Sequence, residues 1–246
     1  MLCPAKMLGN ASPIHLSGGS SGTVWRRSKH SFIFGGGFQA RSYGGQADWR
    51  PERKNMRLFV ALDVPEDVRG ALRELVAKLK PLSRSARWAR PEGLHVTLKF
   101  IGHAIDRPES GKLGELRAAL AGVRSEAPVE MRFRGVGFFP DARRPRVVWC
   151  GVEASANLAP LAAEIEKAAA KIGIPREERV FVPHLTLARF KAPEGAEALV
   201  RAVNEFASRD FGAARAAEFH LYESMLKPSG SEYRKIETYG FVEGAA

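Results

Sequence analysis

From Met56 onward, hydrophobic and polar positions follow two patterns in turn, one typical of strands and one typical of helices. The segment 66–82 has apolar residues at helical spacing, whereas 57–65 is a short apolar run that favours a buried strand. The same criteria predict strands at 57–65, 94–102, 129–140, 146–153, 181–190, 216–226 and 231–241, and helices at 66–82, 110–123, 157–173 and 195–208. In chain order, a strand–helix–strand–helix–strand unit occurs twice.

The two units keep a constant offset. His184 follows His95 by 89 residues, and Thr186 follows Thr97 by the same number. The first strands and the third strands of the two units keep this offset as well. An internal duplication explains the repetition better than chance spacing does. It predicts two similar lobes, at about 56–140 and 146–242, related by a pseudo-two-fold axis.

Residues 1–55 have a different composition and predict a disordered extension. The stretches "LSGGSSGT" and "FGGGFQARSYGGQ" are rich in Gly and Ser, without hydrophobic periodicity, and the segment holds eight Lys/Arg against two acids. Three interpretations stay open: an upstream extension without function, a transit peptide, or a nucleic-acid-binding arm. The first is favoured because Met56 opens the first convincing strand. The folded domain is therefore placed at 56–246.

Composition narrows the class of protein only modestly. The 246 residues are 45% hydrophobic and 26% charged, and no apolar run approaches the roughly 20 residues of a membrane span. The two cysteines, Cys3 and Cys150, are too far apart in sequence for a C-x-x-C motif, which disfavours a disulfide framework or a cysteine-based zinc site. A reducing compartment, the cytoplasm, fits best. The formal charge of +11 suits an anionic ligand such as RNA but does not identify one.

Two predicted strands carry the same unusual pair of polar residues. "HVTLKFIG" contains His95 and Thr97, and "HLTLAR" contains His184 and Thr186. Because residues i and i+2 of a strand share a face, each pair lies on the side opposite its apolar neighbours. If the lobes meet about a pseudo-two-fold axis, both pairs line one central cleft.

Two imidazoles and two hydroxyls are well matched to a phosphodiester. Histidine titrates near neutral pH, so one ring can accept a proton while the other donates one. Threonine hydroxyls can donate hydrogen bonds to the non-bridging phosphate oxygens, and no metal is needed. A single His-x-Thr in a strand is more often only a satisfied polar pair, but two copies at matching places reverse that preference. A metal site is disfavoured, since only His103 and His220 remain as imidazoles in the domain.

The motifs "RLFVALDVP", "HVTLKFIG", "GVGFFPDARRPRVVWCGV" and "HLTLAR" resemble those of the two-histidine phosphoesterase superfamily. Within it, the chain is most similar to the RNA 2′,3′-cyclic phosphodiesterases, historically called 2′-5′ RNA ligases. The resemblance covers about residues 56–242. It implies a bilobal α+β fold with antiparallel-type sheets flanking a central cleft, no cofactor, and hydrolysis of RNA 2′,3′-cyclic phosphate ends to 2′-phosphates.

The resemblance also implies roles for individual residues. His184 activates the attacking water and His95 protonates the departing 3′ oxygen, while Thr97 and Thr186 bind the phosphate. The family often has an arginine five residues after the second histidine, here Arg189. Strict alternation places Arg189 on the face opposite to His184, so it is either a phosphate ligand at a twist in the strand or a solvated surface residue.

Other residues receive weaker predictions. Lys99 shares the face of the first pair by alternation and is expected to be a solvated lysine at the rim, with RNA phosphate as the alternative partner. Phe59 is predicted as core rather than as part of a base pocket, and Trp149, at the position equivalent to Val60, as core. His220 and Tyr222 are predicted to be structural.

Two alternatives to an RNA-end phosphodiesterase stay open at this point. One is a non-catalytic module that binds nucleotides or RNA ends, which the completeness of both pairs disfavours. The other is the same chemistry on a small cyclic nucleotide. Because the duplication already supplies an internal two-fold, a monomer is expected.

Overall fold

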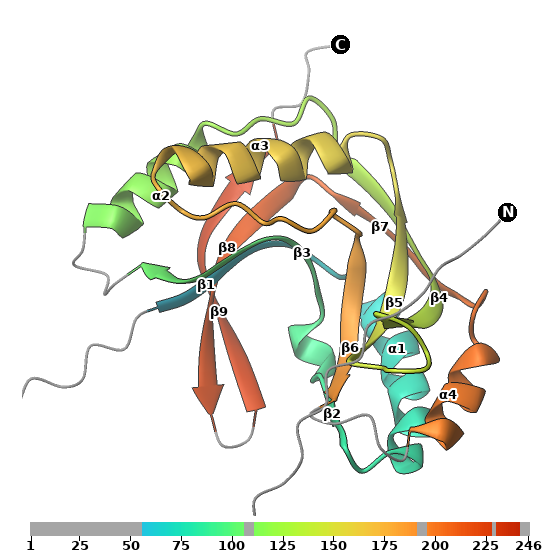
Figure 1. The fold of residues 1–246 in the computed structure, drawn as a ribbon. Helices are drawn as coiled ribbons and strands as arrows, with labels where there is room; N and C mark the ends of the chain where they lie inside the picture. Colours follow the sequence, from blue (N-terminus) through green and yellow to red (C-terminus); the bar gives the residue numbers. More distant parts are fainter. Residues whose placement is uncertain (1–55, 106–110, 191–195, 228–229, 242–246) are drawn as a thin grey trace, which may run out of the picture. The chain divides into compact units, whose positions relative to one another are not determined.

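The computed structural model describes residues 56–105, 111–190, 196–227 and 230–241 (Figure 1). The predicted extension over 1–55 lies outside these ranges and stays a prediction. The described strands and helices are β1 (Met56–Asp63), α1 (Glu66–Leu79), β2 (Ala86–Trp88), β3 (His95–Ile105), α2 (Gly111–Ala121), β4 (Val129–Phe139), β5 (Val147–Ala154), α3 (Leu158–Lys171), β6 (His184–Phe190), α4 (Glu197–Asn204), β7 (Asp210–Ala216), β8 (Glu218–Lys227) and β9 (Gly230–Gly240), with 3-10 turns at Lys80–Leu82 and Pro91–Gly93.

Over the described ranges, all the predicted strands and helices are present, and the pattern missed only the short strand β2 and the polar strand β7. Two strand boundaries shift most, by three residues each: β3 ends at Ile105 rather than at residue 102, and β6 begins at His184 rather than at residue 181. Pro183 precedes it, and proline has no N–H to donate to a strand ladder. Helix α4 is also shorter than predicted, because the chain after Asn204 continues as turns.

The strands form one curled antiparallel sheet in the order β7-β4-β5-β6-β3-β1-β8-β9, with β2 paired to β6. The two strands that carry the histidines, β3 and β6, meet at its centre, where Val96 pairs with Leu185. Both of these side chains are fully buried. A one-residue slip of either strand would expose its apolar side, at a cost of about 2 kcal/mol for each buried aliphatic residue. The hydrophobic pattern therefore fixes which face the histidines take.

The sheet order is symmetric about the β3–β6 pair, as the duplication predicts. Exchanging β1 with β5, β3 with β6, β4 with β8 and β7 with β9 gives the same order read from the other end. The third strand of each repeat pairs with the first strand of the other repeat: β4 lies beside β5, and β8 lies beside β1. The α+β fold is confirmed, and the two repeats interlock through this strand exchange. The division into lobes at about 56–140 and 146–242 stays a prediction.

Strand β3 carries one extra residue directly after the first polar pair. Thr97 pairs with Ala61 of β1, and Lys99 pairs with the neighbouring Val60, so Leu98 has no partner of its own. Such a β-bulge makes two residues oppose one and reverses the alternation of faces beyond it.

Strand β6 carries the same irregularity at the equivalent place. Thr186 pairs with Trp149 of β5 and Ala188 pairs with Val148, which leaves Leu187 as the extra residue. The duplicated unit therefore includes a bulge after each His-x-Thr pair.

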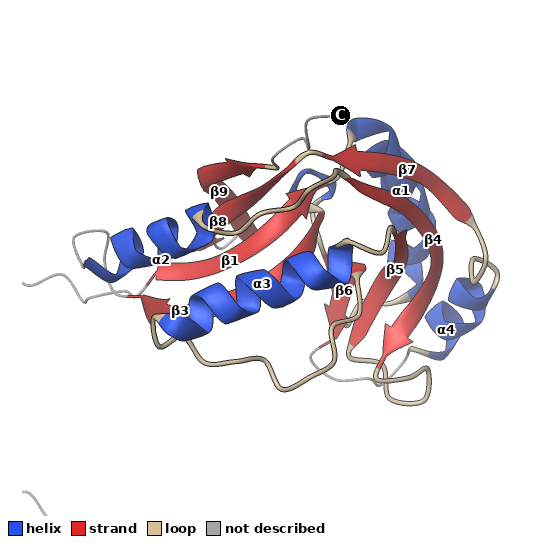
Figure 2. Cartoon of the chain, turned by 90° about the horizontal axis from the view of Figure 1, so that it is seen from above, coloured by secondary structure: helices blue, strands red, loops and turns tan. Residues whose placement is uncertain are grey.

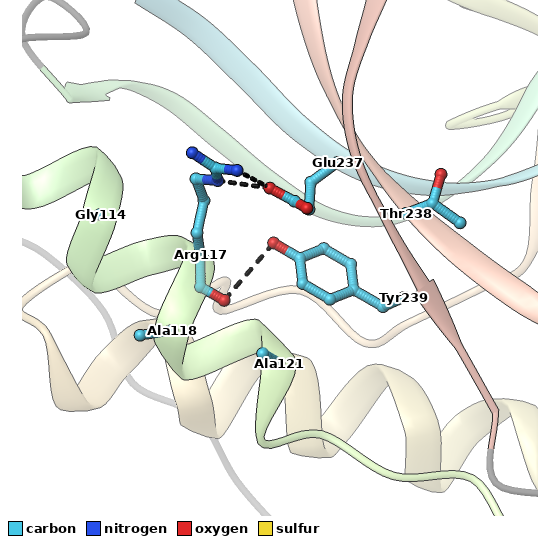
Figure 3. Close-up of a pocket in the computed structure, with 7 residues that line it drawn as sticks. All are labelled: Gly114, Arg117, Ala118, Ala121, Glu237, Thr238 and Tyr239. Atoms are coloured by element: carbon cyan, nitrogen blue, oxygen red, sulfur yellow. Dashed lines mark hydrogen bonds and ion pairs between the residues drawn. The ribbon is translucent and has the colours of Figure 1, made fainter.

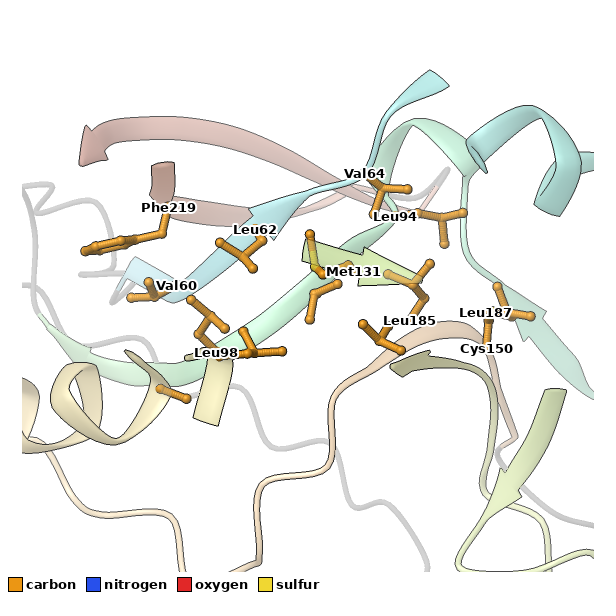
Figure 4. Close-up of a cluster of buried hydrophobic side chains, with 14 of the residues drawn as sticks. Val60, Leu62, Val64, Leu94, Leu98, Met131, Cys150, Leu185, Leu187 and Phe219 are labelled. Atoms are coloured by element: carbon orange, nitrogen blue, oxygen red, sulfur yellow. The ribbon is translucent and has the colours of Figure 1, made fainter. Parts of the chain in front are cut away.

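The helices cover the apolar side of the sheet in two groups (Figure 2). Helix α3 contacts β3 and α2, and α1 contacts β7 and α4. Figure 4 shows part of the core, to which Val60, Leu98, Leu185, Leu187 and Phe219 contribute from four strands. Because the core occupies this face, the polar residues of the central strands are left on the other one. Among the described residues, no helix combines the length and apolar character needed to cross a bilayer.

Candidate active site

The two polar pairs lie together where β3 and β6 meet. One residue to either side of the single pair that joins these strands, the antiparallel register places His95 opposite Thr186 and Thr97 opposite His184. All four side chains are half-buried, while the residues between them are buried in the core. The predicted convergence of the two pairs is therefore seen in the structure.

The way in which the pairs converge differs from the expected arrangement. Sequence reasoning placed the histidines on two sheets that face each other across a cleft. In the structure, β3 and β6 belong to one sheet, so the two pairs are neighbours on one curved face. Because the two central strands pair directly, the two histidines lie on adjacent strands of the same sheet.

Both imidazoles are oriented by a backbone carbonyl two residues upstream. The Nδ1 atom of His95 lies 2.7 Å from the oxygen of Gly93, and that of His184 lies 2.8 Å from the oxygen of Val182. Since a carbonyl can only accept, each Nδ1 is the protonated donor. Each ring therefore presents Nε2, the atom that can exchange a proton with a substrate.

Aromatic side chains hold the His95 ring in place. Phe59 stacks on it with ring centroids 4.5 Å apart and an interplanar angle of 28°, and Tyr233 contacts it edge-on at 5.1 Å. Phe59 itself is only 3% exposed. It is buried, as predicted, but it packs against aromatic rings on the histidine face rather than in the main hydrophobic core, so it supports the histidine.

His184 has a different aromatic neighbour. Phe139 contacts it edge-on at 5.0 Å and lies 5.3 Å from the ring of Trp149. The predicted equivalence of Trp149 with Val60 is wrong, because Trp149 pairs with the second threonine as Ala61 pairs with the first. Trp149 is half-buried on the histidine face and not in the core. In the first strands the two repeats are thus offset by 88 residues rather than 89.

The environment of both rings favours the neutral imidazole in the free protein. Burial lowers the pKa of His95 to about 4, against the opposing effect of the Gly93 carbonyl, and the charge of Arg189 lowers it further. Burial and Arg189 also lower the pKa of His184. A bound phosphodiester would bring a negative charge to both rings and raise both pKa values. We therefore expect an imidazole of the site to take up a proton when an anion binds.

Arg189 lies on the same face as His184, contrary to what strict alternation predicts. The bulge at Leu187 shifts the alternation by one residue, and the Nη2 atom of Arg189 lies 3.5 Å from Oγ1 of Thr186. The side chain is exposed. A guanidinium at this place can neutralise a phosphate bound by the threonines.

The equivalent position of the first repeat is Phe100, five residues after His95. The bulge on β3 turns its ring to the histidine face, where it is 48% exposed. The guanidinium of Arg57 lies 5.3 Å from the ring centroid. The pseudo-two-fold site thus has an arginine on one side and an exposed aromatic ring on the other.

The expectation of a solvated Lys99 is wrong. Its side chain is 2% exposed, and its Nζ lies 2.8 Å from Oε1 of Glu166 and 2.7 Å from the carbonyl oxygen of Pro175. The bulge at Leu98 turns it away from the histidines and toward α3. Lys99 is therefore a structural link and does not face the site.

His220 and Tyr222 take part in a charged network that sequence reasoning missed. Tyr222 donates to Oδ1 of Asp63, and Lys235 donates to Oδ2 of Asp63 at 3.0 Å. Asp63 pairs in register with His95, so the network borders the site. These residues come from three strands, β1, β8 and β9, and only the strand pairing reveals their proximity.

A pocket lies elsewhere, between α2 and β9 (Figure 3). It is bordered by the ion pair of Arg117 with Glu237 and by Tyr239, whose hydroxyl donates to the Arg117 carbonyl at 3.5 Å. Neither histidine pair lines it. Within the described part of the chain, no group of three or more His, Cys, Asp or Glu side chains could hold a metal ion.

Comparison with known proteins gives consistent matches over the described region. The model of the 2′-5′ RNA ligase superfamily matches residues 59–224, more than half of the chain. A protein of Methanothermobacter thermautotrophicus named RNA 2′,3′-cyclic phosphodiesterase is 34% identical over 185 residues, which cover 75% of this chain and 98% of that protein. A protein of the same name from Thermus thermophilus is 37% identical over 190 residues, 75% of this chain and 89% of its own.

Solved structures match the same region. TT0787 of Thermus thermophilus is 34% identical with a TM-score of 0.62, and the match covers 77% of this chain and 100% of that one. LigT of E. coli, crystallised with 3′-AMP, is 25% identical with a TM-score of 0.59, over 76% of this chain and 99% of its own. By sequence and by fold, the chain belongs to the 2′-5′ RNA ligase superfamily.

Proposed function

We propose that the protein is an RNA 2′,3′-cyclic phosphodiesterase, which opens a cyclic phosphate at an RNA end to leave a 2′-phosphate. The observation that carries this proposal is the pairing of two His-x-Thr motifs across β3 and β6, with Nε2 of each imidazole available on one face. The names of the similar proteins support the same activity.

The reaction follows from the placement of the groups. Nε2 of His184 accepts a proton from water as the water oxygen forms a bond to phosphorus. The bond from phosphorus to the 3′ oxygen breaks in line, and His95 donates its proton to that oxygen. Thr97, Thr186 and Arg189 stabilise the charge on the non-bridging oxygens. The product is a 2′-phosphate with a 3′-hydroxyl, and the two histidines exchange protonation states through solvent before the next turnover.

Two features support a nucleotide substrate over a simple phosphodiester. The exposed ring of Phe100 lies on the histidine face and offers a surface on which a base can stack. Arg57, beside the ring of Phe100, and Arg179 add positive charge: burial lowers the pKa of Arg189 and of His184, and the charges of Arg57 and Arg179 lower these two pKa values further. Stacking surfaces beside cations are typical of single-stranded RNA recognition.

The direct test uses the full chain in EDTA with an oligoribonucleotide that ends in a 2′,3′-cyclic phosphate. Conversion to a 2′-phosphate end, identified by mass spectrometry and ³¹P NMR, is the expected result. A small cyclic mononucleotide is run in parallel, and a higher kcat/KM for it would move the substrate to that class. Tight binding of the RNA end without turnover would make the protein a binding module, and loss of turnover in EDTA would contradict metal-independent chemistry.

The guanidinium of Arg189 gives a first prediction for this mechanism. Arg189→Met is expected to lower kcat on the cyclic RNA end by about 10²-fold, in the range found for removal of one group that stabilises transition-state charge. Steady-state kinetics check the value. Arg201→Met removes an exposed arginine from α4 and serves as the matched control, with kcat unchanged. A loss below about threefold for Arg189→Met would remove it from the site.

We also propose that the protein acts as a monomer in the cytoplasm. The duplicated repeat supplies an internal two-fold, which leaves no need for a second copy to complete the site. Cys150 is buried and free, in keeping with a reducing compartment. Sedimentation and fractionation of the native protein test these two statements.

A further inference from the structure

The two histidines occupy equivalent positions in the repeat, but the strand beside each one carries a different residue. Asp63 of β1 pairs with His95, whereas Gly151 of β5 pairs with His184. Paired residues of an antiparallel ladder point to the same face and are close neighbours. One histidine therefore has a carboxylate beside it, and the other has none at the equivalent place.

The carboxylate of Asp63 is held by residues of the β8–β9 hairpin. Tyr222 donates to its Oδ1, Lys235 donates to its Oδ2 at 3.0 Å, and Nε2 of His220 lies 3.4 Å from Oδ2. His220 is 1% exposed, and its Nδ1 lies 3.0 Å from the hydroxyl oxygen of Thr238. Burial tends to raise the pKa of Asp63, but the hydrogen bonds from Tyr222 and Lys235 outweigh it, so the carboxyl stays ionised.

A continuous aromatic stack connects this carboxylate to His95. Tyr222 stacks on Phe59 at 5.3 Å with an interplanar angle of 14°, and Phe59 stacks on His95 at 4.5 Å. Tyr233 closes the side, perpendicular to both Phe59 and His95. The hydroxyl of Tyr222 is fixed by Asp63, so the carboxylate anchors the far end of the stack.

We infer that Asp63 is a positioning residue, which orients His95 through the Tyr222–Phe59 stack and whose charge stabilises the protonated form that donates to the leaving oxygen. The inference rests on the proposed function, in which His95 is the general acid. The asymmetry of the site supports it. Asp63 lies beside His95, whereas Gly151 occupies the equivalent place beside His184, so of the two rings only His95 has a neighbouring carboxylate that favours its protonated form.

The titratable and charged groups that face His95 set the sign of the expected effects. They are Asp63 of β1, His184 and Arg189 of β6, and Tyr233 of β9; of these, only Asp63 has a charge that raises the pKa of His95. Asp63→Asn removes that charge and leaves the positive charge of Lys235 without its carboxylate partner, so both changes disfavour the imidazolium. Lys235→Met removes the opposing positive charge and acts in the opposite direction.

The test is the pH dependence of kcat for the full-length protein on an oligoribonucleotide ending in a 2′,3′-cyclic phosphate. The alkaline limb reports loss of the proton from the general acid in the bound state. With Asp63→Asn, this limb is expected to move to lower pH by about one unit, the low end for loss of a neighbouring opposite charge. Tyr222→Phe keeps the stack and the charge, so its limb stays in place while kcat falls. Lys235→Met is expected to move the limb to higher pH.

A general loss of structural order would lower kcat in both charge variants, Asp63→Asn and Lys235→Met. It would not move the alkaline limb in opposite directions in the two variants. Glu223→Gln removes another carboxylate from the same hairpin, one paired with Arg234, and is expected to leave the limb unchanged. Equal limbs in Asp63→Asn, Lys235→Met and wild type would overturn the inference.

Failure of the proposed function would be visible separately, as absence of turnover in the wild type. In that case the pKa of His95, measured by NMR with inorganic phosphate bound, gives the same comparison without catalysis. It is expected to be lower in Asp63→Asn and higher in Lys235→Met. An unchanged value in both variants would again overturn the inference.

Discussion

Replacing either histidine with alanine is expected to lower kcat on an RNA 2′,3′-cyclic phosphate by about 10²- to 10⁴-fold, the usual contribution of a positioned general acid or base. In His184→Ala no group remains at Nε2 to accept the proton of the attacking water. In His95→Ala the 3′ oxygen must leave without a proton. KM should change little, because in the proposed mechanism Thr97, Thr186 and Arg189 hold the phosphate and all three remain.

The control for these variants is His103→Ala, since His103 is an exposed histidine on the same strand as His95. It is expected to retain wild-type kcat. The double variant His95→Ala/His184→Ala should lose little more than either single variant, because groups that act as a unit give non-additive losses. Retention of more than a tenth of wild-type kcat in His184→Ala would exclude the paired mechanism, and so would a comparable loss in His103→Ala.

The elements and their repetition could be predicted because both depend on local patterns. The apolar periods mark the strands and helices of both repeats, and the offset of 89 residues between the two His-x-Thr pairs marks the duplication. The pattern also places His95 and Thr97 on the face opposite Val96, as the structure does. Local alternation and burial of Val96 agree here, so the polar pair has only one side to occupy.

The same pattern fails one residue later, at the bulge on β3. Alternation places Lys99 with Thr97 and Phe100 with the core, and the structure has the reverse. A bulge depends on what the flanking residues meet in three dimensions. The carboxylate that compensates the buried charge of Lys99 belongs to Glu166, 67 residues away in sequence. The residues near Lys99 in sequence give no sign of this partner.

The exchange of third strands and the network around Asp63 could not be predicted either, because they also depend on residues that are distant in sequence. In sequence, Asp63 is a polar residue at the end of a strand, just before a helix. Its partners Tyr222 and Lys235 lie 159 and 172 residues away. They meet it only because β8, from the second repeat, pairs with β1 from the first. The topology that builds the symmetric site therefore also supplies its asymmetry.

Removing Glu166 is expected to be the most destabilising of the substitutions considered. Its carboxylate is 24% exposed and pairs at 2.8 Å with the ammonium of Lys99, whose side chain is 2% exposed. Glu166→Ala leaves that buried cation with only the Pro175 carbonyl as a partner. Loss of one member of a buried pair costs about 3–5 kcal/mol, and the partial exposure of Glu166 places the expected loss near 3 kcal/mol. Denaturant unfolding at pH 7 measures it.

Two comparisons separate the buried charge from a general effect on α3. Lys99→Met removes the charge itself and fills the same apolar path, so its expected loss is smaller than that of Glu166→Ala. Glu164→Ala breaks an exposed pair with Lys167 on the same helix, and its expected loss is below about 1 kcal/mol. Losses of similar size in Glu166→Ala and Lys99→Met would show that burial of the lysine charge is not the dominant cost.

Glu166→Ala is also expected to lower kcat, although Glu166 touches neither histidine. Its Oε1 accepts from Lys99, two residues beyond Thr97 on β3, and from the backbone N–H of Glu177 at 3.2 Å. The segment that begins at Glu177 runs to Val182, whose carbonyl orients the ring of His184. The carboxylate of Glu166 thus connects β3, the strand of His95, to the segment that precedes His184. A variant that loses about 3 kcal/mol of stability yet keeps full kcat at low temperature would show that the site is positioned by the β3–β6 pair alone.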